Sequence, residues 1–285
     1  MPDTIQTDTP PLFAAIQLNS SDDLQANLET SRLQLIAAKQ AGAVCAVLPE
    51  NFAWMGDESE AGNIAELEGH GPVQTFLSDI AKELGLWIIG GSHRLIVPND
   101  QEHRVTNTTL VYNPDGQPAA RYDKIHLFDA NVNDGTSYHE SATFKAGESI
   151  VVIDMGFARV GLSICYDIRF PELYQALRHK KADVIVVPAA FTVPTGRAHW
   201  KPLLRARAIE NQVYIFAPAQ CGTHSNGRET WGHSLCIDPW GEVISMLKDQ
   251  PGNIYCPFDI QVVDKIRTQM PVAGHHRPEV IHTNK

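Results

Sequence analysis

A cysteine stands where a strongly apolar segment of the chain turns abruptly polar. The segment RVGLSICYDIRFPEL covers residues 159–173, with Cys165 at the junction. The apolar run predicts a buried strand, and Pro171 and Glu172 suit the first turn of a helix that follows it. A thiol near a helix N-terminus is stabilised as a thiolate, and the backbone N–H of Tyr166 is placed to bind an oxyanion. The segment therefore predicts a nucleophile at the mouth of a cleft or, alternatively, a small residue packed in the core.

Two charged residues stand at comparable positions elsewhere in the chain. Glu50 ends the apolar run in AVCAVLPEN, and Lys124 lies in RYDKIHLFD. Singly, each is typical of a solvated carboxylate or a surface ion pair. Together with Cys165 they provide what a thiol nucleophile requires, namely a proton acceptor, a cation for the tetrahedral intermediate and a proton for the leaving amine. His126 and His199 are candidates for a histidine base, although the sequence marks neither of them.

The elements expected to position these residues alternate between strands and helices. Apolar and β-branched runs predict strands at 12–18, 43–48, 86–92, 106–113, 150–155, 159–165, 183–190, 213–219, 232–238 and 253–260. Helices are expected at about 24–41, 72–84, 170–181, 198–211 and 260–269. The sequences NPDG at 113–116 and DPWG at 238–241 predict hairpin turns. This mixture predicts an α/β protein whose mixed sheets are covered by helices.

Composition argues against several classes of protein. The chain has 285 residues, a net charge of −10 and a pI near 5.6, which opposes a nucleic-acid-binding face and requires a local basic pocket for any anionic substrate. No apolar stretch is long enough to cross a membrane, and the N-terminus lacks a secretory signal. The five cysteines contain no CxxC pair, which predicts neither a disulfide framework nor a zinc site and fits a reducing cytoplasm.

Three motifs taken together resemble those of the nitrilase superfamily of carbon–nitrogen hydrolases. They are PEN around Glu50, YDKIHLFD around Lys124 and GLSICYDIRFPEL around Cys165, in family order. The resemblance implies a four-layer αββα sandwich, with a carbon–nitrogen hydrolase domain over residues 11–270. Residues 1–10 and 271–285 are then expected to be flexible or partner-contacting tails. It also implies pairing of the chain into a homodimer or a higher homo-oligomer.

The resemblance further implies a catalytic mechanism for the three residues. Glu50 is the general base that takes the proton of Cys165 and later protonates the leaving amine. Lys124 and the Tyr166 backbone N–H stabilise the oxyanion, and water then hydrolyses a thioester. The segment YHESATFKAG supplies Glu140 at the place of a second family glutamate, which orients Lys124 or the substrate. The substrate is a small amide, and no metal or organic cofactor is required.

Two further segments resemble the Nit branch of this superfamily. They are AFTVPTGRAHWKPLLRARAIENQVYIFAPAQCG and RETWGHSLCIDPWGEV. The resemblance implies cleavage of deaminated glutathione, in which the γ-glutamyl amino group has become a keto group, to 2-oxoglutarate and cysteinylglycine. The alternatives are an ω-amidase acting on 2-oxoglutaramate and an N-carbamoyl or nitrile hydrolase. From another class, a catalytically silent binding protein on the same scaffold is the competing hypothesis.

Substrate carboxylates require cations or hydrogen-bond donors near the nucleophile. The candidates for substrate binding are Arg169, Thr195, His199 and Arg207. Arg169 carries the guanidinium fork that suits a carboxylate, but an ion pair with Asp167 or Glu172 is an equal alternative. Arg207 falls on the apolar stripe of the predicted 198–211 helix, where it must either pair with Glu210 or face a polar cavity.

Overall fold

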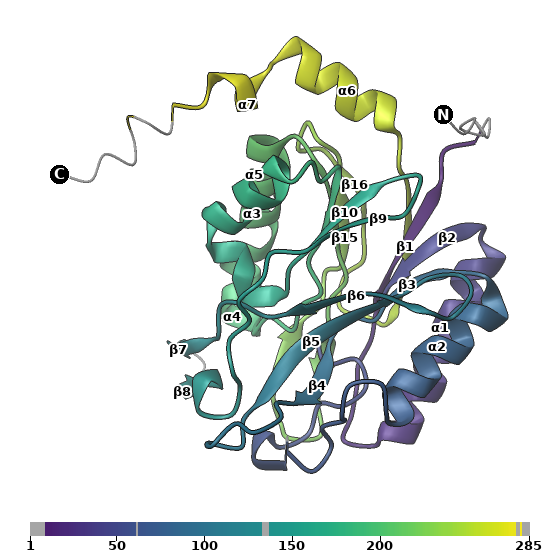
Figure 1. The fold of residues 1–285 in the computed structure, drawn as a ribbon, viewed down its shortest axis with the longest axis vertical. Helices are drawn as coiled ribbons and strands as arrows, with labels where there is room; N and C mark the ends of the chain where they lie inside the picture. The colour runs from purple at the N-terminus through teal and green to yellow at the C-terminus, as the bar shows by residue number, and fades with distance from the viewer. Residues whose placement is uncertain (1–8, 61, 133–136, 278–279, 281–285) are drawn as a thin grey trace.

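Two β-sheets pack face to face between two layers of helices (Figure 1). The computed structural model describes residues 9–60, 62–132, 137–277 and 280. In this part of the chain the first sheet has seven strands, in the order β17 (Gly252–Pro257), β1 (Leu12–Gln17), β2 (Ala43–Val47), β3 (Trp87–Ile89), β5 (Val105–Tyr112) and β4 (His93–Ile96), with β6 (Pro118–Asp123) also paired to β5. The second sheet has the order β16 (Val243–Met246), β15 (Leu235–Ile237), β12 (Tyr214–Ala217), β11 (Val184–Val186), β10 (Arg159–Leu162) and β9 (Val152–Asp154).

Helices cover the outer face of each sheet (Figure 1). Those on the first sheet are α1 (Leu24–Gln40) and α2 (Pro72–Leu84), and those on the second are α3 (Pro171–His179) and α5 (Lys201–Asn211). Two small hairpins, β7 (Asp129–Asn131) with β8 (Ser137–His139) and β13 (Cys221–Thr223) with β14 (Glu229–Trp231), lie outside these sheets. This is the αββα sandwich that the motifs implied, and the predicted fold class is confirmed.

The remaining helices are short or lie near the C-terminus. They are α4 (Val193–Thr195), α6 (Ile260–Gln269) and α7 (Val272–His275), with 3₁₀ turns at Glu58–Glu60, Glu140–Ala142 and Cys165–Arg169 and a π turn at Gly196–Trp200. Arg267 on α6 donates to Asp183 at 2.6 Å, which ties this helix to the start of β11. The predicted N-terminal tail falls almost entirely on residues 1–8, outside the described residues, whereas part of the predicted C-terminal tail is α7. None of the helices in the described ranges has both the length and the apolar character needed to span a bilayer.

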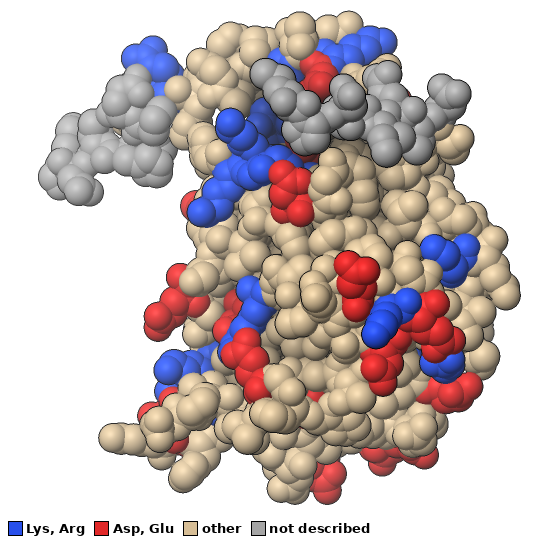
Figure 2. Space-filling model, turned by 45° about the vertical axis from the view of Figure 1, so that its right-hand side comes forward, with Lys and Arg blue, Asp and Glu red and all other residues tan. Residues whose placement is uncertain are grey.

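The surface carries charges of both signs. On the face shown in Figure 2, acidic and basic side chains lie in mixed groups, separated by broad uncharged areas. The excess of acidic residues gives the net charge of −10. Such a surface does not draw an anionic ligand from a distance, so a site for one must supply its own cations.

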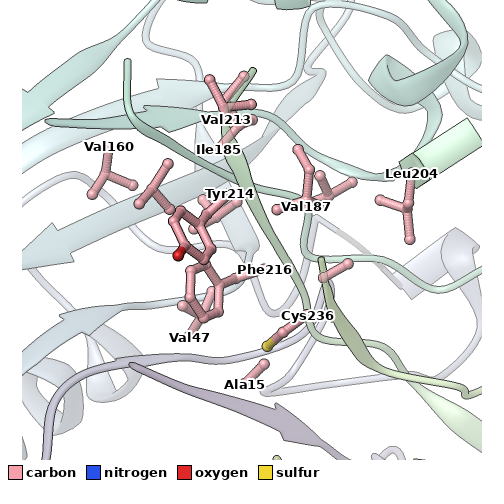
Figure 3. Packing of buried hydrophobic residues seen from close by; sticks show 14 of the residues in the cluster. Ala15, Val47, Val160, Ile185, Val187, Leu204, Val213, Tyr214, Phe216 and Cys236 are labelled. Carbon is pink, nitrogen blue, oxygen red and sulfur yellow. The ribbon is translucent and has the colours of Figure 1, made fainter. Parts of the chain in front are cut away.

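The inner faces of the two sheets form the main core. Phe13 of β1 stacks on Phe216 of β12 with ring centroids 4.6 Å apart. Figure 3 shows Ala15 and Val47 of the first sheet facing Phe216 and Cys236 of the second. These side chains are fully buried, so the relative position of the two sheets is fixed by close packing. Residues at the ends of strands in different sheets are thereby held at defined separations.

The parallel strands of both sheets deliver their carboxyl ends to the site described below. β2 pairs in parallel with β1 and β3, and β10 pairs in parallel with β11. Strand β10 is shorter than the predicted 159–165, because it ends at Leu162 and Cys165 begins a 3₁₀ turn instead. Both predicted hairpin turns are present, joining β5 to β6 and β15 to β16.

Candidate active site

Glu50 is held rigidly where the chain leaves β2. Its backbone carbonyl accepts a hydrogen bond from Gln220, and its side-chain Oε2 accepts the backbone N–H of Ala190 at 2.8 Å. Gly91 makes this turn possible, because a Cβ there would lie 2.1 Å from the carbonyl oxygen of Pro49, and its φ of +52° favours glycine. The Glu50 side chain is only 3% exposed, so its orientation is set by these contacts.

Cys165 occupies an unusual backbone conformation at the head of the turn that follows β10. Its φ is +47°, in the left-handed region that non-glycine residues rarely adopt. The N–H of Cys165 donates to the carbonyl of Pro188 at 2.9 Å, which pins the residue against the chain leaving β11. Strained residues of this kind gather at active sites, where the surrounding structure holds them in place.

A buried carboxylate organises the turn that carries the cysteine. Asp167 is fully buried and accepts four hydrogen bonds within the described residues. The donors are the hydroxyl of Tyr122 at 2.6 Å, the backbone N–H of Ile164 at 2.9 Å, and both the backbone N–H and the ring of His126 at 3.0 and 2.7 Å. The ring of His126 is thereby used to hold Asp167 and does not line the cavity at Cys165. The candidate histidine base is therefore a structural residue.

Lys124 brings the two glutamates together. It follows β6, and its Nζ donates to Glu50 Oε1 at 3.0 Å and to both carboxylate oxygens of Glu140 at 2.9 Å. The backbone N–H of Phe128 also donates to Glu140 at 2.6 Å. Asn107, in the middle of β5, donates to Glu50 at 3.0 Å and to Glu140 at 3.4 Å. One ammonium and one amide thus link two buried carboxylates that lie far apart in the sequence.

The charges of this cluster determine the protonation of its members. Burial would raise the pKa of Glu50, but the charge of Lys124 and hydrogen bonds from Cys165 and Lys124 lower it below its usual range. Burial raises the pKa of Glu140 and Lys124 opposes this, while the nearby charge of Glu50 leaves the net shift upward. Burial would lower the pKa of Lys124, but the two carboxylates raise it well above its usual value. The cluster therefore pairs a firmly charged ammonium with an ionised Glu50.

The nucleophile is a neutral thiol in the free protein. Burial and the charge of Glu50 raise the pKa of Cys165 well above its usual value, although Lys124 opposes the shift. The prediction of a thiolate stabilised by a helix N-terminus is therefore wrong. The turn Cys165–Arg169 is too short to build a sizeable dipole, and the thiol donates a hydrogen bond to Glu50 instead. A thiol hydrogen-bonded to a carboxylate base is prepared for deprotonation when an electrophile arrives.

A cavity opens above these groups. It encloses about 560 Å³ of space that extends out to solvent, and Glu50, Lys124, Glu140 and Cys165 all line it. One wall is aromatic: Phe128 packs against Tyr138 and Tyr166 with ring centroids 5.0 Å apart in each case. Phe191 and Thr192 line the cavity as well. A cavity of this kind, with ionisable groups on an aromatic-lined wall, is typical of a site for a small molecule.

Of the predicted substrate-binding residues, Arg169 and Thr195 line the cavity. Arg169 is half-buried, and its guanidinium lies 5.6 Å from the ring centroids of both Tyr166 and Phe191. It donates to the Nδ1 of His199 at 3.3 Å, and among the described residues it forms no ion pair with Asp167 or another carboxylate. His199 itself is exposed, and in the described part of the chain it contacts the site through Arg169 alone.

Arg207 is not part of the cavity wall. It is 6% exposed, and its Nε donates to the carbonyl of Ile168 at 2.8 Å while Nη1 pairs with Glu210 at 2.7 Å. The prediction that it binds substrate is corrected by these contacts, because Nε supports the turn after Cys165 and Nη1 pairs with Glu210 on the same helix. The alternative considered for this residue, an ion pair on the helix surface, is what the structure shows.

Two residues of the site escaped the sequence analysis. Asn107 lies within a strand and Arg228 in a hairpin, and neither position carries a local motif. Arg228 donates to the carbonyl of Ala190 at 2.8 Å, and its charge contributes to the lowered pKa of Glu50. Only the folded structure reveals that Asn107 contacts both glutamates and that Arg228 lines the cavity. In the described ranges, no cluster of three or more His, Cys, Asp and Glu side chains has the arrangement of a metal site.

Comparison with known proteins identifies the family. The sequence matches the carbon–nitrogen hydrolase family model over residues 12–268. The chain belongs to this family. As a carbon–nitrogen hydrolase it acts on carbon–nitrogen bonds other than peptide bonds, and the predicted membership of the nitrilase superfamily is confirmed.

Several relatives of this hydrolase are similar over nearly their whole length. It is 42% identical over 272 residues to the deaminated glutathione amidase of Synechocystis sp. (strain PCC 6803 / GT-S), covering 93% of this chain and 98% of the relative. It is 40% identical over 265 residues to that of Yersinia enterocolitica, covering 93% and 92%. The crystal structure of Saccharomyces cerevisiae Nit3, a member of branch 10 of the nitrilase superfamily, matches with a TM-score of 0.83 and 29% identity, covering 93% of this chain and 95% of that one.

Proposed function

We propose that this carbon–nitrogen hydrolase cleaves the amide bond of deaminated glutathione, releasing 2-oxoglutarate and cysteinylglycine. The observation that carries the proposal is the contact between Cys165, Glu50 and Lys124 in one cavity. The substrate follows from the relatives, since those from Synechocystis and Yersinia enterocolitica are deaminated glutathione amidases. The cavity adds support, because it contains cations for an anionic substrate in a protein of negative net charge.

The first half of the proposed reaction forms a thioester. Glu50 takes the proton of the Cys165 thiol as the sulfur attacks the amide carbon, and the carbonyl oxygen becomes an oxyanion. The Nζ of Lys124 and the backbone N–H of Tyr166 stabilise this charge. When the carbon–nitrogen bond breaks, Glu50 returns the proton to the departing nitrogen. Cysteinylglycine leaves, and the 2-oxoglutaryl group remains on sulfur.

The second half hydrolyses that thioester. Glu50, again ionised, takes a proton from a water molecule as its oxygen attacks the thioester carbon. The same two donors hold the new oxyanion, which collapses to release 2-oxoglutarate. The departing sulfur recovers its proton from Glu50, and the enzyme returns to its starting state. In this mechanism Glu140 keeps Lys124 charged and directed at the reacting carbonyl.

Arg169 is the residue we assign to the keto-acid carboxylate of the acyl group. It is half-buried at the cavity wall, without a carboxylate partner among the described residues, and rests on two aromatic rings. A guanidinium in this setting binds a carboxylate through two parallel hydrogen bonds. Thr195 adds a hydroxyl to the same wall, where its Oγ1 lies 2.8 Å from that of Thr192.

Substitution of the nucleophile tests the proposal. Cys165→Ala should lower kcat/KM for deaminated glutathione by at least about 10³-fold, because no other group replaces the attacking sulfur. The circular dichroism spectrum and melting temperature should stay close to those of the wild type. Glutamate dehydrogenase can detect the 2-oxoglutarate that is released. Retained turnover in a rigorously purified Cys165→Ala protein would contradict the mechanism.

The choice of substrate is tested by a direct comparison. 2-Oxoglutaramate carries the same acyl group and releases ammonia, so it differs from deaminated glutathione only on the amine side. We expect kcat/KM to be higher for deaminated glutathione. A preference for 2-oxoglutaramate would assign the protein to the ω-amidase reaction instead and would leave the proposed chemistry of Cys165 unchanged.

A further inference from the structure

A second hollow adjoins the cavity and has no role in the mechanism described so far. It encloses about 1380 Å³ of space open to solvent, and its walls include Asp57, Val193, Asn226 and Glu229. Tyr138 and Arg228 line both this hollow and the cavity at Cys165. We refer to it as the outer groove. Because the two spaces share wall residues, they lie side by side.

The boundary between the two spaces is a defined contact. The guanidinium of Arg228 lies 5.2 Å from the ring centroid of Tyr138, and it also donates to the carbonyl of Ala190. Tyr138 comes from the β7–β8 hairpin, whereas Arg228 immediately precedes β14. Two hairpins from distant parts of the sequence therefore meet at this point, and each end of the contact is held by its own hairpin.

The hairpin that carries Arg228 is anchored in the body of the protein. His224 is buried, and its ring nitrogens lie 2.7 Å from the carbonyl of Ser20 and 2.7 Å from the hydroxyl of Thr230. Asn226 donates to the carbonyl of Gly56 at 2.9 Å. These contacts connect the hairpin to the segments beside β1 and β2, so the wall that this hairpin contributes to the outer groove is preformed. A preformed subsite costs little ordering when a ligand binds.

The charges on the groove indicate what it accepts. Its described ionisable residues are Asp57, His139, Arg228 and Glu229, of which Arg228 alone is positively charged at every pH of interest. A guanidinium at the inner end of a groove suits a carboxylate that lies about two residues from the scissile nitrogen, a reach of about 7 Å for an extended peptide. The two acids at the rim would weaken binding of the same anion.

We propose that the outer groove is the subsite for the leaving amine, and that Arg228 binds the terminal carboxylate of a dipeptide leaving group. The proposal rests on the proposed function and adds to it the part of the molecule that distinguishes a dipeptide from ammonia. Arg169 then faces the acyl side of the amide and Arg228 the amine side. Two cations at opposite ends of one path explain how an acidic protein binds a substrate with two carboxylates.

Substrates that share the 2-oxoglutaryl group but differ in the amine test this assignment. The amines are ammonia, cysteine, cysteinylglycine and cysteinylglycine amide. In the wild type, kcat/KM should be about tenfold higher for the substrate that releases cysteinylglycine than for the substrate that releases cysteinylglycine amide. This is the size expected for a hydrogen bond to a charged group. Arg228→Gln should reduce that ratio to about one, and Arg228→Lys should restore part of it. Because Arg228 also acts on Glu50, a loss common to all four substrates is expected in addition.

A charge change at the rim provides a test of opposite sign. Glu229→Gln removes an acid from the groove. It should raise the ratio of kcat/KM between the cysteinylglycine substrate and its amide about twofold, because the terminal carboxylate is repelled less. Glu242→Gln makes the same change at an exposed residue that does not line the groove, and it should leave the ratio unchanged. Melting temperatures of all variants would show that each is folded.

The outcomes separate the subsite from the proposed function. A ratio that stays the same in Arg228→Gln, or a wild type indifferent to the terminal carboxylate, overturns the subsite while deaminated glutathione remains a substrate. If the wild type cleaves 2-oxoglutaramate with a higher kcat/KM than deaminated glutathione but still shows the Arg228-dependent ratio, the proposed function is wrong and the subsite stands. A wild type that cleaves only 2-oxoglutaramate overturns both.

Discussion

Glu50 and Glu140 share one ammonium group, and this sharing is the central chemical feature of the site. Ionisation of two buried carboxylates beside a single cation is unfavourable, because the two negative charges repel each other. Glu50 has the additional hydrogen bond from Ala190 and the contact with the thiol, so it holds the negative charge more firmly. The base is thereby kept ionised, and Glu140 is the first of the two to take up a proton as the pH falls.

This order predicts the acid limb of the pH profile. Since the pKa of Glu140 is raised, kcat/KM of the wild type should fall on acidification at a pH above the usual value of about 4.3 for glutamate. Glu140→Gln should lower kcat/KM by about 10²-fold, by loosening Lys124, and should move the acid limb below that value, where the lowered pKa of Glu50 governs it. Rates measured between pH 4 and 8 at constant ionic strength provide the test. Identical acid limbs in both proteins would refute the assignment.

At this scale the sequence revealed the residues that lie beside a motif and missed those that do not. Glu50 and Cys165 each follow an apolar run and Lys124 lies in the motif YDKIHLFD, and the structure brings their side chains to one cavity. Asn107 sits inside a polar-looking strand, TNTTLVY, where an asparagine has no local signature. Its contact with both glutamates depends on the position of β5 in the sheet. Pairing of this kind cannot be read from residue types alone.

Among the elements, those with strong periodicity were predicted best. The predicted 72–84 and 260–269 helices coincide with α2 and α6, whose N-terminal signals are Pro72 and the capping residue Asp259. The strand β6 was missed because PAARYD lacks an apolar run and Tyr122 alone of its residues is buried. It nevertheless carries the chain to Lys124, so an edge strand without a sequence signal positions one of the three central residues. The segment forms a strand because it pairs with β5, and not because of its own residue types.

The turn between β10 and α3 depends on Asp167. Asp167→Ala should lower the free energy of unfolding by about 3–5 kcal/mol, because it leaves several buried donors without an acceptor. Tyr122→Phe removes only one of these bonds and should cost about 1–2 kcal/mol. Urea unfolding followed by tryptophan fluorescence gives both values. Equal effects of the two substitutions would show that the carboxylate does not organise the turn.

For the whole molecule, the sandwich explains why residues remote in sequence meet. Glu50 follows the first sheet, Cys165 follows the second, and the packed core between the sheets sets the distance between them. The alternation of strands and helices predicted mixed sheets, and the resemblance supplied the four-layer arrangement. The order of strands in each sheet could not be derived from the sequence, since it depends on long-range pairs such as β1 with β17.

The same resemblance implied a homodimer, and we propose that the surface around α5 mediates it. Ile209 on α5 is 42% exposed and Trp240, in the turn between β15 and β16, is 56% exposed. The two elements are joined by Arg205, whose Nε donates to the carbonyl of Gly241 at 2.8 Å. Exposed large apolar side chains on a continuous surface are typical of protein interfaces.

Light scattering coupled to gel filtration tests this interface. The wild type should elute with about twice the mass of the 31.5 kDa chain, and Trp240→Asp should shift it toward the monomer, because a charge at an apolar contact must be desolvated on association. Leu67→Asp is the matched control, since Leu67 is 51% exposed in the segment before α2, on the other sheet. Dissociation by the control alone would place the interface on the first sheet, and a monomeric wild type would refute pairing altogether.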